Sequence, residues 1–303
     1  MQRLLYIIII IAALTACKKE IDFDFHEVEP VVVIEGRVTN EGTSVIITRS
    51  RSVTDSVSPR CLQGAAVTVT ADGVATALTY DAASDRYRSS MTGVAGKTYL
   101  LNVDFDGHHY EASAYMSPPA PILSADFCWM SVLDERVLVY ELWAVDPFPD
   151  ERNHYWYRID RISHHTHLVD KKKSEPYRWG VLDDRGCPPG LVFLDMMSTS
   201  EKVMDEDEEE NWKRILYDGD SIFCQLMTID RPVYDYFSSL RAGQSGGANP
   251  RSNITGGCLG YFAAGSVTRT DTLVFTRSSV TEWKNAIPER PAPNNLAKNL
   301  LRQ

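Results

Sequence analysis

Long apolar runs are missing from this sequence after its first sixteen residues. Beyond them, no stretch approaches the roughly 18 apolar residues that a membrane-spanning helix needs. The one apolar run, residues 4–13, is too short to cross a bilayer, and Arg3 places a positive charge before it. A positive residue followed by a short apolar segment is typical of a secretory signal peptide. We therefore predict that residues 1–16 are a signal peptide and that the remaining chain lies outside the cytoplasm.

The next residues, Leu14-Thr15-Ala16-Cys17, have the order of a lipobox: an apolar residue and two small residues precede a cysteine. Cleavage before Cys17 makes this cysteine the first residue of the mature chain and the acceptor of lipid. Two or more acyl chains hold a protein stably on a membrane, whereas one chain binds reversibly. We predict lipidation of Cys17 and membrane attachment through it; the alternative is an ordinary secretory signal with a chance cysteine.

Positive charge is also scarce, because the chain has 31 Lys and Arg residues against 41 Asp and Glu residues. Removal of residues 1–16, which contain Arg3 and no acidic residue, changes the formal net charge from −10 to −11, by the one charge of Arg3. A net-acidic protein repels the phosphate backbone of nucleic acids. We therefore predict no nucleic-acid partner.

Cysteines in metal-binding or redox spacing are missing as well. No two cysteines form a C-x-x-C motif, which argues against a zinc ribbon or a thioredoxin-like site. With Cys17 lipidated, an odd number of thiols is left, so at least one is unpaired in a compartment that permits disulfides. We expect buried, unreactive thiols and no cofactor. The pattern leaves open any disulfide pairing among Cys61, Cys128, Cys187, Cys224 and Cys258.

Strand patterns are abundant in the first part of the mature chain. A polar tether, residues 17–30, leads to a β-branched run at 31–34, and residues 66–70 alternate apolar and polar side chains. The dipeptides Asp72-Gly73 and Asp106-Gly107 are strong signals for two-residue hairpin turns. Short strands at regular spacing with such turns favour a β-sandwich over residues 31–116.

A proline-rich segment, residues 117–121, separates this region from a second one, because prolines cannot continue a strand ladder. We assign residues 122–287 to a C-terminal β-rich domain and residues 288–303 to a loose tail. Within the domain a polar insertion covers 163–190 and an acidic one 199–212. Strand patterns lie at 123–129, 137–145, 154–162, 221–228 and 259–267.

One helix is predicted in the second region. Asp230 suits its N-cap and Pro232 its first turn. Apolar residues then repeat at helical spacing as Val233, Tyr236, Phe237 and Leu240, a stripe that must pack on a sheet. The expected fold is all-β, with two tandem β-sandwich (immunoglobulin-like) domains and one short helix in the second.

Several motifs follow one another along most of the mature chain: Cys17-Lys18-Lys19-Glu20-Ile21-Asp22, Val33-Ile34-Glu35-Gly36-Arg37-Val38-Thr39-Asn40, Gly96-Lys97-Thr98-Tyr99, Ser117-Pro118-Pro119, Tyr234-Asp235-Tyr236-Phe237-Ser238-Ser239-Leu240, Asn249-Pro250, Ser252-Asn253-Ile254 and Gly257-Cys258-Leu259-Gly260-Tyr261-Phe262. In the order and spacing of these motifs the chain resembles a known family, the Bacteroidota lipoproteins catalogued as domain of unknown function 4249. The resemblance implies no catalytic residues. It implies an outer-membrane lipoprotein that is a non-enzymatic accessory of a TonB-dependent transporter for nutrient uptake. The charged tether after Cys17 implies a position facing the cell exterior, with the periplasmic face as the alternative.

Histidines suggest a competing function. His165 and His167 would share one face of a strand and fill two positions of a zinc site, as a surface metal-dependent hydrolase requires. No H-E-x-x-H motif accompanies them, and the neighbouring lysines favour a solvated loop. The acidic run at 205–210 lacks the spacing of a calcium loop and likewise favours a solvated loop. A third alternative is an adhesin or another structural surface subunit.

A glycine-rich excursion follows the predicted helix. Long loops in compact domains are often functional, so this one is our preferred partner-contact surface. Aromatic side chains of the second region, Trp156 among them, fit a ligand platform or core packing equally well. The partner-contact candidates are Gly246, Gly247, Asn249, Asn253 and Trp179.

Overall fold

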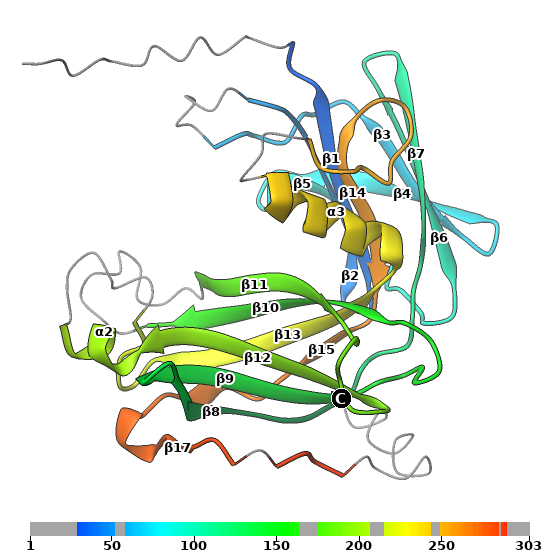
Figure 1. Ribbon diagram of the computed structural model, residues 1–303. Helices are drawn as coiled ribbons and strands as arrows, with labels where there is room; N and C mark the ends of the chain where they lie inside the picture. The colour runs from blue at the N-terminus through cyan, green and yellow to red at the C-terminus, as the bar shows by residue number, and fades with distance from the viewer. Residues whose placement is uncertain are drawn as a thin grey trace, which may run out of the picture. The chain divides into compact units, whose positions relative to one another are not determined.

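The structure, a computed structural model, describes residues 29–51, 58–163, 175–206, 215–243, 249–284 and 286–289. The chain divides into two units, Met1–Pro30 with Arg51–Asp55 and Val31–Ser50 with Ser56–Gln303. Every helix and strand below belongs to the second unit (Figure 1). Of the described residues 54% are in strands and 9% in helices, so the predicted all-β class with a short helix is confirmed. None of the described helices is long and apolar enough to cross a membrane.

Eight strands form one sheet in the order β14-β1-β2-β5-β4-β3-β6-β7. The predicted hairpin at Asp106-Gly107 joins β6 to β7, and the φ angles of 54° and 74° are the positive values that a type I′ turn requires. The strands are β1 (Val32–Thr39), β2 (Gly42–Arg49), β3 (Ala66–Ala71), β4 (Val74–Asp81), β5 (Arg86–Ser89), β6 (Thr98–Phe105), β7 (His108–Tyr115) and β14 (Leu259–Gly265).

The eight strands enclose one apolar core. Alternate residues of each strand point into it, for example Val67 and Val69 on β3 and Leu101 and Val103 on β6, all buried. The two edge strands, β14 and β7, lie in contact. The segment before β14 closes this junction, because the Thr255 backbone N–H donates to the Glu111 carbonyl at 2.8 Å.

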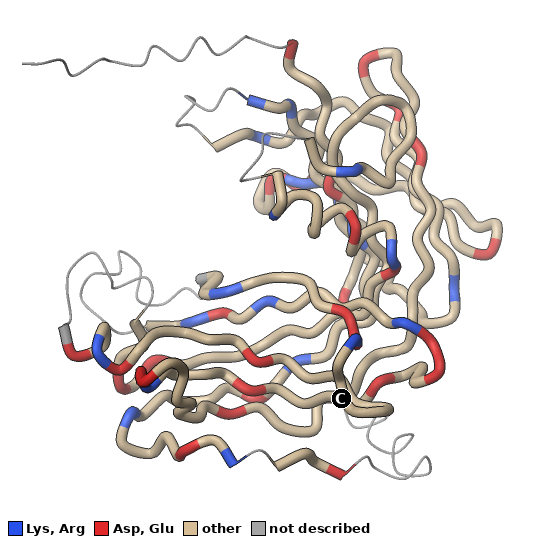
Figure 2. Tube along the Cα trace, in the orientation of Figure 1, with Lys and Arg blue, Asp and Glu red and all other residues tan. Residues whose placement is uncertain are grey.

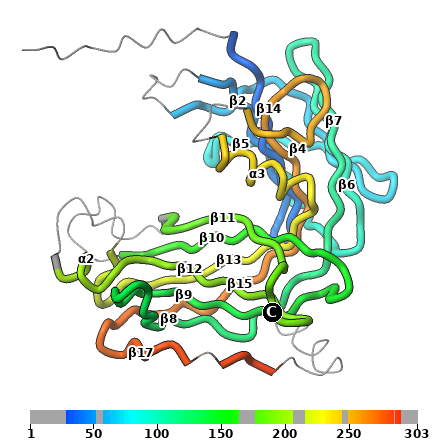
Figure 3. The backbone as a smooth tube through the Cα atoms, viewed as in Figure 1, coloured from blue at the N-terminus to red at the C-terminus, as the bar shows by residue number. Residues whose placement is uncertain are grey.

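Strand β14 comes from the second region of the sequence but belongs to the first sheet. It runs parallel to β1, with Gly260 opposite Ile34, so the orange strand lies beside the blue one (Figure 3). The sequence pattern predicted residues 259–267 as part of the second domain. The pairing of β14 with β1 differs from that prediction. The physical reason is burial on both faces: Phe262 packs into the first core, whereas Tyr261 packs on the opposite side.

The second region is a sandwich of two sheets. One has the order β11-β10-β13-β15, with β16 also on β13, and the other has the order β12-β9-β8-β17. Tyr155 and Leu226 of the first sheet meet Tyr140 and Leu142 of the other in a second apolar core. The elements are β8 (Ile122–Val132), β9 (Glu135–Val145), β10 (His154–Ile162), β11 (Glu175–Asp183), β12 (Leu191–Ser200), α2 (Glu201–Glu206), β13 (Ser221–Ile229), β15 (Val267–Arg269), β16 (Leu273–Val274), the 3₁₀ turn η2 (Arg277–Ser279) and β17 (Thr281–Glu282).

Helix α3 (Arg231–Gly243) matches the predicted helix. The Asp230 carboxylate caps it by accepting a hydrogen bond from the Val233 backbone N–H at 3.2 Å. Its apolar stripe packs on two sheets. A third core joins α3 to Tyr261 of β14 and to Met227 of β13, so the helix lies between the first sheet and the outer face of the sandwich.

At the β1–β14 junction, Gly260 is the glycine that should tolerate a side chain least. Its φ is +109°, and a Cβ atom there would lie 1.9 Å from the Ile34 carbonyl oxygen. We predict that Gly260→Ala lowers the free energy of unfolding by about 2–5 kcal/mol, through backbone strain and overpacking together. Gly107→Ala is the matched control, because its φ is +74° but nothing lies within 4 Å of the added Cβ. Backbone strain alone should cost about 1–2 kcal/mol there. Urea unfolding measures both, and equal losses would contradict the tight β1–β14 approach.

Candidate functional site

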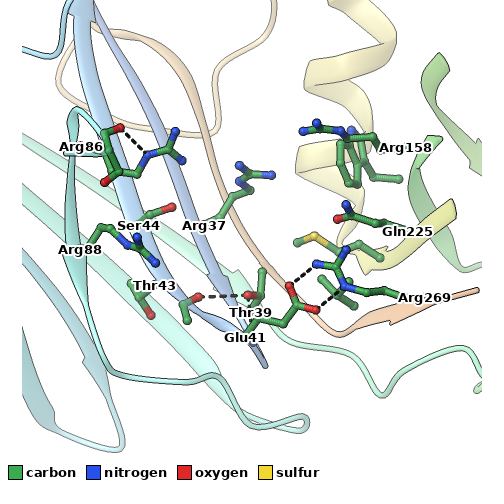
Figure 4. A pocket seen from close by; sticks show the side chains of 15 residues that line it. Arg37, Thr39, Glu41, Thr43, Ser44, Arg86, Arg88, Arg158, Gln225 and Arg269 are labelled. Atoms are coloured by element: carbon green, nitrogen blue, oxygen red, sulfur yellow. Dashed lines mark hydrogen bonds and ion pairs between the residues drawn. The ribbon is translucent and has the colours of Figure 1, made fainter. Parts of the chain in front are cut away.

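The candidate functional site is a cavity of about 310 Å³ between the outer face of the first sheet and the outer face of the five-stranded sheet (Figure 4). Strands β1, β2 and β5 form one wall, and β10, β13 and β15 form the other. Its volume is at the small end of the usual range for ligand pockets. The lining residues are Arg37, Thr39, Glu41, Gly42, Thr43, Ser44, Ser84, Arg86, Arg88, Trp156, Arg158, Gln225, Met227, Val267 and Arg269.

The first wall carries a row of three residues in register, which we call the first arginine row: Arg37, Ser44 and Arg88. Arg37 on β1 is opposite Ser44 on β2, and Ser44 is opposite Arg88 on β5. Because neighbouring strands are about 4.8 Å apart, the two arginine Cα atoms are roughly 10 Å apart. Arg86, two residues before Arg88, faces the same side of the sheet. Three guanidinium groups therefore surround one short hydroxyl side chain.

The second wall repeats this arrangement in what we call the second arginine row: Arg158, Gln225 and Arg269. Arg158 on β10 is opposite Gln225 on β13, and Gln225 is opposite Arg269 on β15. Alternation along these strands decides which side chains face the cavity: Ile222, Cys224 and Leu226 point into the second core, so Gln225 points outward. Each row thus has two arginines separated by one uncharged polar residue.

The arginines of the second row are already paired. Glu41 holds Arg269 with two charge-assisted bonds of 2.7 and 2.5 Å. Arg158 Nη2 lies 2.7 Å from Oδ1 of the buried Asp160 carboxylate, whose other oxygen accepts a bond from Gln225 at 3.2 Å. The second row is therefore close to electrically neutral and offers donors and acceptors side by side.

The first wall keeps part of its positive charge, because the nearby Glu35 carboxylate interacts with Arg37 and Arg86 but forms no ion pair with either. Arg88 has only a long contact, 3.9 Å from Asp81. Within the described part of the chain, neither Arg37 nor Arg86 has a carboxylate at ion-pair distance, and Arg86 Nε donates instead to the Ser84 carbonyl at 3.1 Å. Figure 2 shows acidic residues along strands and turns of both parts of the molecule, in a chain with a formal net charge of −10. A wall with three guanidinium groups therefore departs from the acidic character of the chain.

The floor of the cavity is apolar and rests on helix α3. Trp156 and Met227 line the cavity and also pack with the third core. A small apolar gap under the helix shares both of them, together with Arg37. The sequence left Trp156 open between core packing and a ligand platform, and its half-buried ring takes part in both surfaces.

The cavity presents groups that suit the binding of polar molecules. Its described lining residues include no histidine or cysteine to act as a base or nucleophile, and their one carboxylate, Glu41, is paired with Arg269. The Thr43 hydroxyl donates to the Met91 carbonyl at 2.8 Å, and the Thr39 hydroxyl donates to the Gly42 carbonyl at 3.1 Å. Across the residues that the structure describes, no group of three or more His, Cys, Asp or Glu side chains is placed to hold a metal ion.

The partner-contact candidates that the structure describes, Asn249, Asn253 and Trp179, do not line this cavity. Asn253 contacts β14 with both ends of its amide, donating to the Phe262 carbonyl at 2.8 Å and accepting from its N–H at 2.9 Å. Trp179 is 40% exposed, with its ring 5.8 Å from that of Phe237, and Asn249 is exposed. The predicted sites outside the described residues are Cys17, His165, His167, Gly246 and Gly247.

The cysteines have the environment of inert thiols. Four of the five described ones, Cys61, Cys128, Cys224 and Cys258, are buried, Cys187 is half-buried, and all five are free. Burial raises the pKa of each thiol, because an apolar surrounding disfavours the thiolate. The pKa of Cys128 and that of Cys258 rise from 9.0 to about 11.

These shifts predict slow alkylation with a defined pH dependence. At pH 8 a pKa of about 11 leaves about 100-fold less thiolate than a pKa of 9, so Cys128 and Cys258 should react with iodoacetamide at least about 100-fold more slowly than free thiols. The rate should rise about tenfold per pH unit between pH 8 and 10. Peptide mapping by mass spectrometry measures each site, with the urea-unfolded chain as control. Equal rates in the native and unfolded chains would contradict the buried positions.

Comparison with known proteins agrees with the motifs found in the sequence. A family model described as "Domain of unknown function (DUF4249)" matches residues 18–271, which is most of the chain. No curated protein matches it. The matched range includes both walls of the cavity and helix α3. The chain therefore belongs to the DUF4249 family.

Proposed function

We propose that this chain is a non-enzymatic, lipid-anchored protein of the outer membrane that binds a small ligand and assists a TonB-dependent transporter in its uptake. The observation that carries the binding part is the cavity of about 310 Å³, which has arginine rows on two walls and an apolar floor. A concave site with a few polar groups over an apolar base is the usual form of a ligand pocket.

Among the described residues that line the cavity, no hydroxyl is hydrogen-bonded to a side-chain base, which supports binding over catalysis. An enzyme needs a group that takes or gives a proton, or one that attacks the substrate, within hydrogen-bond reach of the reacting atom. The cavity offers guanidinium groups, one amide, short hydroxyls and the Glu41 carboxylate, which is held by Arg269. Guanidinium groups stay protonated at physiological pH, so they recognise anions and do not act as bases.

The membrane and transporter parts of the proposal have separate support. The lipobox that ends at Cys17 supports attachment by lipid, and the charged tether supports a position facing the cell exterior. Resemblance to accessory lipoproteins supports the transporter as the partner. An accessory that delivers a ligand needs a binding site and a membrane anchor, and the proposal assigns these to different parts of the chain.

A pull-down from outer membranes tests the transporter partnership. The tagged chain, extracted in mild detergent after brief cross-linking, is expected to recover a large β-barrel transporter in near-equal amount. The control is a Cys17→Ala form exported by a signal that is cleaved without lipidation, which should recover much less because it is released from the membrane.

Two results would contradict the proposal. Recovery of the chain alone, from membranes that contain the transporter, would exclude a stable partner of this kind. Stoichiometric zinc in the purified chain, lost in a His165→Ala/His167→Ala variant, would favour the metal-dependent hydrolase instead.

A further inference from the structure

The two arginine rows have the same layout but opposite electrical states. In the second row both guanidinium groups are neutralised, Arg269 by Glu41 and Arg158 by Asp160. In the first wall Arg37 and Arg86 have no ion pair with any described carboxylate, and Arg88 has only a contact of 3.9 Å. A ligand that fits the cavity therefore meets positive charge on one side and neutral polar groups on the other.

The charged wall suits an oxyanion. A guanidinium group presents planar, forked N–H donors that match carboxylate, phosphate and sulfate oxygens in pairs. Arg37 and Arg88 flank Ser44, and the small serine leaves room above the sheet between them. The Arg37 guanidinium extends into the space between the two walls (Figure 4). An oxyanion above Ser44 would supply the close anionic partner that Arg37 and Arg88 lack.

The neutral wall suits hydroxyl groups. A hydroxyl donates one hydrogen bond and accepts others, so it is satisfied best where donors and acceptors alternate. The second row provides this alternation through the Gln225 amide and the Glu41 and Arg269 pair. Trp156 adds an apolar ring face at the floor, which can cover the C–H face of a ring-shaped ligand.

We propose that the cavity binds a small polyhydroxylated oxyanion, of the sugar-acid or sugar-phosphate class, with its anionic group on the first arginine row and its hydroxyls on the second row. This inference rests on the proposed function as a binding protein and specifies the chemical class of the ligand. The anionic group provides most of the affinity, because charge-assisted bonds are about twice as strong as neutral ones. The hydroxyls select the ligand against simple anions.

Calorimetric titration of the full chain in a neutral detergent tests this assignment with four probes at low ionic strength. Glucose 6-phosphate and glucuronate have both features, glucose lacks the anion, and inorganic phosphate lacks the hydroxyl-rich body. We expect the first two to bind with one-to-one stoichiometry. Glucose should bind at least tenfold more weakly, because it loses the charge-assisted bonds, and inorganic phosphate should also be weaker than glucose 6-phosphate.

Substitutions locate the two ends of the ligand. Arg37→Gln/Arg88→Gln should weaken glucose 6-phosphate at least tenfold, because it removes two charged donors. Arg152→Gln/Arg251→Gln is the matched control, since it removes the same charge from two exposed residues away from the cavity and should leave affinity within twofold. Gln225→Ala should weaken glucose 6-phosphate and leave inorganic phosphate unchanged.

Thermal melts confirm that each variant is folded. If the double arginine variant does not fold, Arg88→Gln alone, on an exposed side chain, takes its place, and it should also weaken glucose 6-phosphate.

Several results would overturn the assignment. Glucose binding as tightly as glucose 6-phosphate would remove the anion requirement, and inorganic phosphate binding as tightly would remove the role of the hydroxyls. An unchanged affinity for glucose 6-phosphate in the double arginine variant would place the ligand elsewhere. If none of the probes gives a heat of binding at a concentration on the order of 10 mM, this ligand class is wrong. If the pull-down recovers a transporter but the titration detects no binding, only the ligand assignment is contradicted. If the titration detects binding but the pull-down recovers no transporter, only the transporter partnership is contradicted.

Discussion

The apolar stripe of helix α3 packs against two sheets at once, and the placement of both arginine rows depends on it. Val233 is fully buried, and Tyr236 stacks at 5.1 Å on Tyr261 of β14. On its other side the helix meets Met227 and Trp156 of the five-stranded sheet. Burial of large apolar side chains contributes roughly 1.5–3 kcal/mol each, so a core of this size outweighs a few exposed ion pairs. The cavity lies beside this core and shares Trp156 and Met227 with it.

Hydrogen bonds near the cavity also hold the first sheet against the five-stranded sheet. Asn40, in the turn between β1 and β2, donates to the Val267 carbonyl at 3.0 Å and accepts from the Val267 N–H at 2.8 Å. These bonds join the end of β1 to the start of β15, and the Glu41 and Arg269 pair lies directly beside them. The chain passes from β14 in the first sheet to β15 in the second within two residues. A shift of one wall against the other would therefore break a core and a set of hydrogen bonds together.

Local patterns predicted much of this fold, and the successes have clear causes. The Asp-Gly hairpins were recognisable because type I′ turns need positive φ at both central residues, and α3 because its stripe has a helical period. Strand β11 was taken for a polar insertion, since Pro176 and Gly180 are unusual within a strand; as an edge strand β11 tolerates them. Strand β14 was recognised as a strand, but its neighbour β1 lies more than two hundred residues earlier in the chain.

The arginine rows could not be predicted for the same physical reason. Alternation along a strand tells which face Arg88 or Arg158 occupies, but not which strand lies beside it. Arg37, Arg88, Arg158 and Arg269 are far apart in sequence and meet only through register across six strands. The sequence instead directed attention to loops, where histidines and glycines gather. The sequence signal that could have indicated the cavity is the recurrence of arginines at outward-facing positions of predicted strands.

The cavity requires that the third core makes one cooperative structure of the two sheets that form its walls. Differential scanning calorimetry of the full chain in a neutral detergent measures this most directly. We expect one transition, with the calorimetric enthalpy equal to the van't Hoff enthalpy. Val233→Asp, which puts a charge into the third core, should separate it into two. Two well-separated transitions in the natural chain would contradict the claim, because the walls would then be free to move independently.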